Sequence, residues 1–132
     1  FAGLLAGLSC PGLGGQWSLG LRFGVDHVIH PRPGADQQRL DLTASLQRAL
    51  FGRARLEVVA AYSRTRDKEP YSALLGDVVR RIGRAYLRVE FSHPITAGWD
   101  WLVRGEFQRQ DANLALFDIR SDAVHAGVRK TF

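Results

Sequence analysis

The amino-acid sequence predicts an all-β fold, an antiparallel meander of about seven strands that forms part of a transmembrane up-and-down β-barrel. Three observations predict this fold. Apolar and polar residues alternate along several segments, charged residues stand at mid-strand positions of the polar set, and the connections alternate between short and long. Membrane strands of a barrel carry their hydrophobicity in every second position, so no continuous apolar run is needed.

The alternation is clearest between residues 17 and 25. Trp17, Leu19, Leu21, Phe23 and Val25 occupy the odd positions, and small or charged residues stand between them. Because a strand directs successive side chains to opposite faces, this segment has one apolar and one polar face. Together with the opening segment, similar patterns predict seven strands, at residues 1–10, 16–28, 38–50, 55–64, 84–92, 99–110 and 118–132.

A soluble β-sandwich or a lipocalin-like barrel would show the same alternation. Strand length favours a membrane barrel, because tilted membrane strands need about 9–11 residues whereas globular strands peak near about five or six. Charges in mid-strand would be costly in a packed core, but they pair and hydrate in a polar lumen. The candidate lumen charges are Arg22, Asp26, Arg88, Glu90, Arg104 and Glu106.

The connections also indicate the orientation of the barrel. Counted back from the carboxyl end, the predicted long loops are residues 111–117, 64–83 and 30–36, and tight turns at residues 93–98, 51–53 and 11–15 alternate with them. Bacterial barrels have short periplasmic turns and longer outer loops, so we expect the turns to face the periplasm.

Aromatic residues fall near both ends of the predicted strands, where amphipathic rings favour the membrane interfaces. Tyr62 and Phe107 lie near the outer ends. The candidate periplasmic girdle consists of Trp17, Phe91 and Trp99, with Phe51 and Phe132 at the same level.

The composition argues against several other functions. The net charge is +5, but the basic residues are spread over predicted loops and both strand faces, without the stripe that nucleic acid needs. His27 and His30 lack a third and fourth partner with metal-ligand spacing, so no metal or other cofactor is expected. Ser121 and His125 share the lumen face of the last strand, but alternation puts Asp118 on the other face, so no enzyme is expected.

We interpret residues 1–132 as the carboxy-terminal segment of one barrel domain. The sequence holds no methionine, and no basic-plus-apolar signal opens it. Single-chain bacterial barrels usually have an even number of strands, at least about 8, so seven strands would form part of a larger barrel. We expect such a barrel in the outer membrane of a Gram-negative bacterium, in contact with lipid and lipopolysaccharide.

The last predicted strand ends on a terminal Phe after alternating apolar residues. This ending resembles the carboxy-terminal signature of outer-membrane proteins, which the barrel-assembly machinery reads. The resemblance implies that Phe132, Val128 and Ala126 form a barrel-assembly signal and that this machinery is a partner.

Two further motifs stand in the second half of the chain. They are Tyr71-Ser72-Ala73-Leu74-Leu75 followed by Arg80 and Arg81, and Asn113-Leu114-Ala115-Leu116-Phe117. Together these motifs are similar to the barrel end of Slam-type surface lipoprotein assembly modifiers, and of related barrels linked to tetratricopeptide repeats. The resemblance covers roughly the last half of the chain, and Ala112 departs from it where we expect the family to favour Ser. It implies translocation or assembly of surface lipoproteins or other proteins across the outer membrane, with a lipoprotein client as partner and no catalysis.

Two alternatives stay open at this point. A passive porin or a substrate-specific outer-membrane channel would also need lumen charges of both signs. The candidate outer loop would be a cap or client surface, or a loop that packs over the barrel mouth while its basic residues meet lipopolysaccharide phosphates. Its residues of interest are Tyr71, Leu74, Leu75, Arg80 and Arg81.

Overall fold

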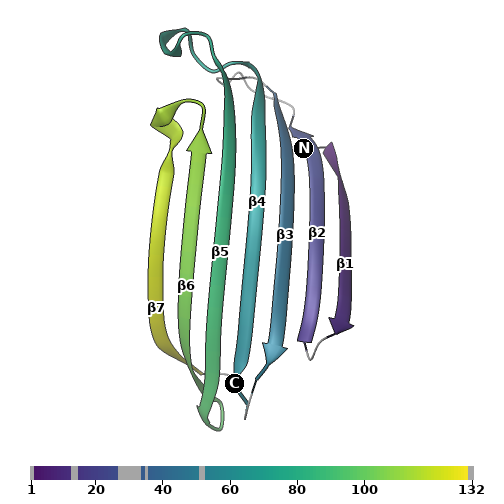
Figure 1. Ribbon diagram of the computed structural model, residues 1–132, viewed down its shortest axis with the longest axis vertical. Helices are drawn as coiled ribbons and strands as arrows, with labels where there is room; N and C mark the ends of the chain where they lie inside the picture. The colour runs from purple at the N-terminus through teal and green to yellow at the C-terminus, as the bar shows by residue number, and fades with distance from the viewer. Residues whose placement is uncertain (1, 13–14, 27–33, 35, 51–52, 131–132) are drawn as a thin grey trace.

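The computed structural model describes residues 2–12, 15–26, 34, 36–50 and 53–130. These residues form one antiparallel sheet in which every strand pairs with its sequence neighbours, in the order β1-β2-β3-β4-β5-β6-β7 (Figure 1). The predicted all-β meander of seven strands is therefore confirmed.

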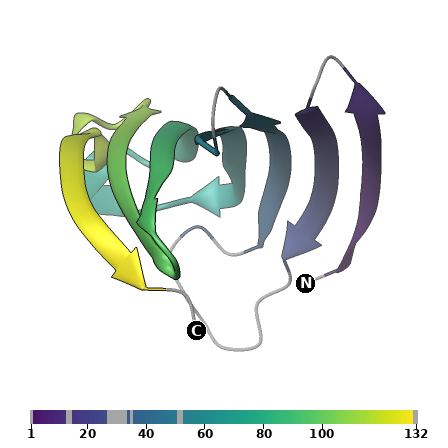
Figure 2. The same ribbon diagram turned by 90° about the horizontal axis from the view of Figure 1, so that it is seen from below.

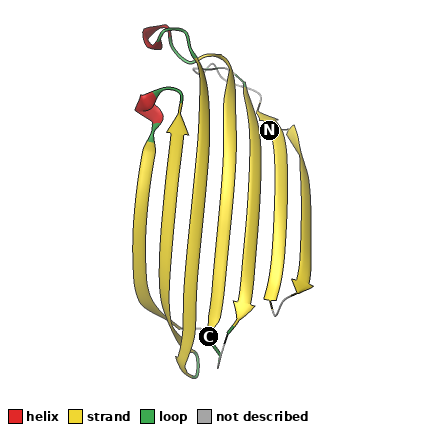
Figure 3. Cartoon of the chain, in the orientation of Figure 1, coloured by secondary structure: helices red, strands yellow, loops and turns green. Residues whose placement is uncertain are grey.

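Long strands dominate the chain, and two short 3-10 helices lie in connections at one end of the sheet (Figure 3). None of the helical segments in the described part of the chain is long and apolar enough to cross a bilayer. The elements are β1 (Ala2–Gly12), β2 (Gly15–Asp26), β3 (Gln37–Ala49), β4 (Arg55–Pro70), η1 (Ala73–Leu75), β5 (Val79–Thr96), β6 (Trp99–Ala112), η2 (Ala115–Phe117) and β7 (Ile119–Lys130).

The sheet has a loop end and a turn end (Figure 1). Residues 71–78, between β4 and β5, and residues 113–118, between β6 and β7, lie at the loop end. At the turn end, only Ala97 and Gly98 join β5 to β6. Gly98 has a φ of 77°, a left-handed conformation that glycine adopts without strain and that lets the chain reverse direction in this short turn.

The sheet is curved, with β1 and β7 at its two edges (Figure 2). Curvature brings side chains of non-adjacent strands together on the concave side. Arg129 of β7 reaches across β6 to Glu90 of β5, with Nη1 and Oε1 3.5 Å apart. The side that carries these two residues is therefore the concave one.

The strand registers gather each alternating set onto one continuous face, because directly paired residues of an antiparallel sheet point to the same side. In β2 and β3, Leu21 pairs with Leu42 and Arg22 pairs with Asp41. We call the concave side the polar face and the convex side the apolar face. The polar face includes Ser18, Arg22, Asp41, Thr43, Glu57, Arg84, Arg88, Glu90, Arg104, Glu106 and Arg129, and the apolar face includes Trp17, Leu21, Leu42, Val58, Leu87, Trp101, Phe107 and Val128.

Burial on the two faces is the reverse of burial in a water-soluble domain. Glu90 and Gln110 on the polar face are 7% and 5% exposed, whereas Leu21 on the apolar face is 46% exposed. Among the described apolar residues, only Ala54 is buried. The interior of the described sheet is therefore built from polar and charged side chains.

Several predicted connections are shorter in the structure than in the sequence interpretation. Strand residues include Pro11 and Gly12 at the end of β1, Gly15 at the start of β2, and Asp111 and Ala112 at the end of β6. β4 runs to Pro70 and β5 begins at Val79, so the predicted loop 64–83 is wrong in its bounds, and Arg80 and Arg81 belong to a strand. The charged run before Pro70 interrupts the apolar alternation, which is why it resembled a loop. β5 also continues to Thr96, so the predicted turn 93–98 is shorter in the structure. The register shifts after Pro94, which has no N–H to donate to the neighbouring strand.

Other predictions fall wholly or partly outside the described residues. They are the strand ends at residues 1, 28 and 132, most of the loop 30–36, and parts of the turns 11–15 and 51–53.

Candidate functional site

A network of ion pairs covers the polar face toward the turn end. Glu90 lies at its centre, where Arg104 donates to Oε2 from Nε at 2.9 Å and from Nη2 at 2.6 Å. Arg129 adds a contact to the other carboxylate oxygen of Glu90 at 3.5 Å. Arg104 also lies 3.7 Å from Glu106, and Arg88 pairs with Glu57 of β4. The pairs Arg88–Glu57, Arg104–Glu90 and Arg129–Glu90 thus link strands β4 to β7 on this face.

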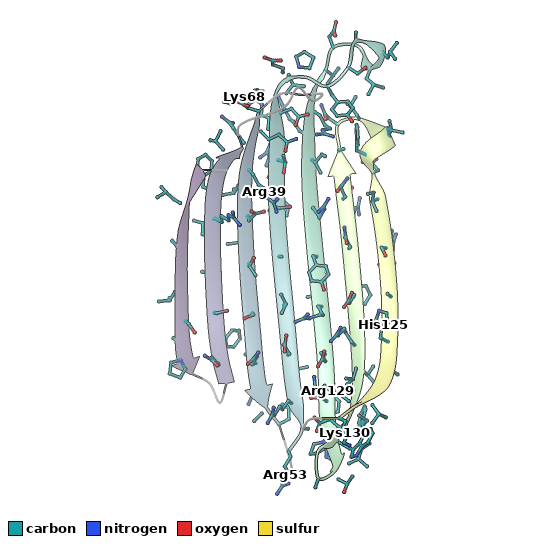
Figure 4. The ribbon with its side chains drawn as sticks, turned by 180° about the vertical axis from the view of Figure 1, so that it is seen from behind. Arg39, Arg53, Lys68, His125, Arg129 and Lys130 are labelled. Atoms are coloured by element: carbon teal, nitrogen blue, oxygen red, sulfur yellow. The ribbon has the colours of Figure 1, made fainter. Side chains whose placement is uncertain are left out.

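Toward the loop end, the polar face holds an open recess of about 520 Å³. Arg22, Asp41 and Arg84 contribute to its lining, and Arg39 pairs with Asp41 at 2.8 Å. Arg84 donates two hydrogen bonds to Oε1 of Gln110, at 2.7 and 3.1 Å. In the view from behind, Arg39 lies toward the loop end, His125 near mid-height and Arg129 toward the turn end (Figure 4).

A buried carboxylate organises the loop end, in what we call the mouth cluster (Asp67, Arg80, Gln37, Tyr71 and Phe117). Asp67 is 2% exposed and accepts a hydrogen bond from Gln37 at 2.8 Å and from Nε of Arg80 at 3.0 Å. The Arg80 guanidinium lies 4.3 Å from the ring centroid of Tyr71 and 4.9 Å from that of Phe117. Cation–π contacts of this kind are worth about 0.5–2 kcal/mol each.

Hydrogen bonds tie the loop between β6 and β7 to the first residues of β5. Asn113 donates from Nδ2 to the carbonyl of Val79 at 2.9 Å and accepts from the Arg81 N–H at 2.7 Å. The Tyr71 and Phe117 rings meet edge to face, with centroids 5.0 Å apart. The segments 71–81 and 113–117, which carry the resemblance stated above, are thus in direct contact although they are far apart in the sequence.

Each loop also presents an apolar side chain outward. Leu74, in η1, is 96% exposed, and Leu116, in η2, is 76% exposed. Ser72 caps η1 by accepting the Leu74 N–H at 3.2 Å, and Gly76 ends it in a left-handed conformation. Both leucines therefore stand on short turns that are anchored by the mouth cluster.

Aromatic residues mark the turn end on the apolar face. Trp99 opens β6, with the Lys130 ammonium 5.6 Å from its ring centroid. Phe91 lies beside Trp101, with ring centroids 5.3 Å apart. Trp17, near the start of β2, is 40% exposed. The three predicted girdle residues therefore lie toward one end, and the structure adds Trp101 to them.

The predicted site residues separate into several places. The lumen charges Arg22, Arg88, Glu90, Arg104 and Glu106 share the polar face, and Asp26 is the last residue of β2, paired with Gln37. Of the predicted assembly signal, Ala126 and Val128 lie on the outward side of β7, and Phe132 lies outside the described residues. Arg80 and Arg81 are adjacent in sequence, but they lie on opposite faces of β5.

Sequence reasoning identified Glu90, the centre of the turn-end network, but it missed the partners Arg129 and Gln110 and the buried Asp67 of the mouth cluster. Asp67 stood in a charged run that resembled a loop, and Arg129 and Gln110 stood near the predicted strand ends. Their positions opposite Arg80, Glu90 and Arg84 depend on strand register, which alternation alone does not determine. The polar face as a whole could be found from the sequence, but its pairing could not.

The polar face carries side chains of both charges, from Arg22 and Asp41 on β2 and β3 to Arg104 and Glu106 on β6. In the described part of the chain, no group of three or more His, Cys, Asp or Glu side chains is placed to hold a metal ion. No protein-family model, curated protein or solved structure matches the chain.

Proposed function

We propose that this chain is part of an outer-membrane β-barrel that translocates or assembles surface lipoproteins, or other proteins, across the outer membrane of a Gram-negative bacterium. The observation that carries the proposal is the reversed burial of the sheet. Large apolar side chains stand exposed on the convex face, and charged side chains are packed together on the concave face.

Water is a poor solvent for the apolar face. Exposed apolar area costs about 25 cal/mol per Å², and monomeric soluble proteins rarely expose continuous apolar patches larger than a few hundred Å². Trp17, Leu19, Leu21 and Phe23 of β2 are each at least 40% exposed, and the face continues over the neighbouring strands. A hydrocarbon environment on this side and water on the polar face would suit both sets of side chains.

The proposal also needs the sheet to close. β1 and β7 are sheet edges, and unpaired N–H and C=O groups in lipid would cost several kcal/mol each. We infer that further strands complete the barrel, because single-chain bacterial barrels have at least about 8.

Two features of the mouth support protein translocation or assembly in particular. The two segments that resemble Slam-type modifiers meet there, through Arg80 and Asn113. Leu74 and Leu116 project from anchored turns, where they are suited to contact an apolar part of a client.

The barrel is tested with the full natural chain that contains these residues, refolded in detergent. We expect a compact band in a gel that migrates differently after heating. A chain that stays soluble without detergent and shows no such shift would contradict the membrane proposal.

The translocation step is tested with the variant Leu74→Ser/Leu116→Ser, since two exposed side chains can be changed without loss of packing. We expect less lipoprotein at the cell surface, measured by protease accessibility on intact cells, with heat-dependent migration unchanged. The matched control is Ala73→Ser/Ala115→Ser, which alters the same two turns but keeps both leucines. Equal surface display in both variants and in the natural chain would rule out client contact at these turns.

A passive porin or a substrate-specific channel is the second candidate. The balanced charges of the polar face favour it, because such charges line an aqueous passage without the cost of burial. Current through a planar bilayer separates the two candidates. Steady conductance whose ion preference shifts with Asp41→Asn, together with normal surface display in the Leu74→Ser/Leu116→Ser variant, would favour the channel.

A further inference from the structure

Three arginine side chains gather on the outward side of the sheet near the loop end. Arg66 of β4 pairs directly with Arg81 of β5, and Arg64 lies two residues from Arg66 on the same face. All three are exposed, and no described carboxylate forms an ion pair with any of them. We call Arg64, Arg66 and Arg81 the arginine patch.

Other outward arginines near this end are neutralised within their own strands. Arg109 of β6 pairs with Asp111 at 2.9 Å, and Arg120 of β7 pairs with Asp122 at 3.4 Å. Among the described residues of this end, the outward arginines without an ion-pair partner therefore lie on β4 and β5.

This arrangement is unfavourable unless an anion occupies it. Like charges directly opposite each other on neighbouring strands destabilise a sheet, and side chains so paired have Cβ atoms about 4.5–5.5 Å apart. Two guanidinium groups at that spacing can both donate to one phosphate, each through two parallel N–H groups. The Arg81 backbone is held in place by Asn113, so the patch does not depend on a mobile loop.

Apolar side chains adjoin the arginine patch. An open recess of about 340 Å³ is lined by all three arginines of the patch, by Arg39 of β3, and by Gln38, Leu40 and Phe23. Leu40 and Phe23 are 38% and 49% exposed, and both belong to the apolar face. A ligand that fits this recess carries phosphate at one end and hydrocarbon at the other.

We propose that the arginine patch binds a phosphate group of an acylated glycolipid headgroup in the outer leaflet, with its acyl chains over Leu40 and Phe23. The proposal rests on the proposed membrane orientation, in which the loop end faces outward. The phosphate is held by charge-assisted hydrogen bonds, and the adjoining apolar side chains favour a lipid over free phosphate.

The test compares Arg66→Gln/Arg81→Gln with the control Arg109→Gln/Arg120→Gln, which removes two arginines from the same side and the same end. Lipid retained by the full chain in detergent is measured with purified lipid A carrying two phosphates and with dephosphorylated lipid A. We expect Arg66→Gln/Arg81→Gln to bind the phosphorylated lipid at least about tenfold more weakly, and the control to stay within about twofold of the natural chain. All three chains should bind the dephosphorylated lipid equally weakly.

A stability measurement gives a second readout. Without lipid, Arg66→Gln/Arg81→Gln should melt at or above the temperature of the natural chain, because repulsion between the paired arginines is relieved. With phosphorylated lipid A, the natural chain should gain melting temperature and the variant should not. A lower melting temperature of Arg66→Gln/Arg81→Gln without lipid would show that the arginines do not repel each other in the natural chain, which would contradict the proposal.

Several results would overturn the proposal. Unchanged affinity of Arg66→Gln/Arg81→Gln, or equal binding of dephosphorylated lipid A by the natural chain, would exclude a phosphate site. Displacement by micromolar inorganic phosphate would assign the site to a free anion, and equal affinity for phosphatidylglycerol would remove the preference for a glycolipid. Heat-dependent gel migration is scored on the same samples, so failure of the patch and failure of the barrel are recognised separately.

Discussion

Replacing Arg80 by methionine should open the loop end locally. Arg80 is 14% exposed and pairs with Asp67, whose side chain is 1% exposed. Removing one partner of a buried pair costs about 3–5 kcal/mol, because the remaining charge stays buried without compensation. Asp67 keeps its hydrogen bond from Gln37, so we expect the lower end of this range, about 3 kcal/mol, including the lost contacts to Tyr71 and Phe117.

Hydrogen exchange detects such an opening. A change of about 3 kcal/mol in opening free energy corresponds to about a hundredfold faster exchange. We expect this acceleration in residues 71–78 and 113–118 of Arg80→Met, and little change at the turn end.

Two further variants separate the effect of the buried charge from the loss of an ion pair as such. Arg39→Met removes a comparably close pair, at 2.8 Å, but Arg39 is 52% exposed, so the expected effect is below about 1 kcal/mol. Adding Asp67→Asn to Arg80→Met should recover much of the lost protection, because no buried charge then remains. If the loop end of Arg80→Met exchanges no faster than in the natural chain, or no faster than in Arg39→Met, the buried pair does not stabilise this end.

Three other predictions follow from single positions. Gly34→Ala should destabilise the loop end more than Gly76→Ala in denaturant titrations. Both glycines have positive φ, so alanine costs about 1 kcal/mol of stability at either position. Only at Gly34 would the added Cβ lie 2.2 Å from the Asp67 carboxylate. Glu90→Gln should lower the unfolding free energy by about 2 kcal/mol, because the arginines that it binds lose a charged acceptor, and an unchanged denaturation midpoint would contradict this. Deleting Phe132 should lower the amount of folded protein in cells several-fold, measured as the band whose gel migration changes on heating. Refolding in detergent should still succeed. Equal amounts of this band with and without Phe132 would exclude an assembly signal.

Much of the sheet could be predicted from the sequence. Trp17, Leu21 and Val25 alternate with small or charged residues, and this period of two survives in β2 because the strand presents a different environment on each side. Strand length was harder to predict. β5 has 18 residues and β4 has 16, and their charged extensions toward the loop end lack the alternation that identifies a strand.

The candidate site was predicted only in part. The sequence placed charges such as Glu90 and Arg104 on one face, but it could not pair them, since pairing depends on the register of neighbouring strands. Arg80 and Arg81 illustrate the limit. As neighbours in a supposed loop they looked equivalent, yet in β5 one turns to the buried Asp67 and the other to the arginine patch.

A spin-label scan along β3 determines which face of the sheet contacts lipid and which contacts water. Single labels are placed on the full chain in lipid vesicles, and their collisions with dissolved oxygen and with a water-soluble nickel chelate are compared. We expect oxygen access at Leu40, Leu42 and Ala44, and chelate access at Asp41 and Thr43, in strict alternation. Equal chelate access at both sets would contradict it, because the apolar face would then lie in water.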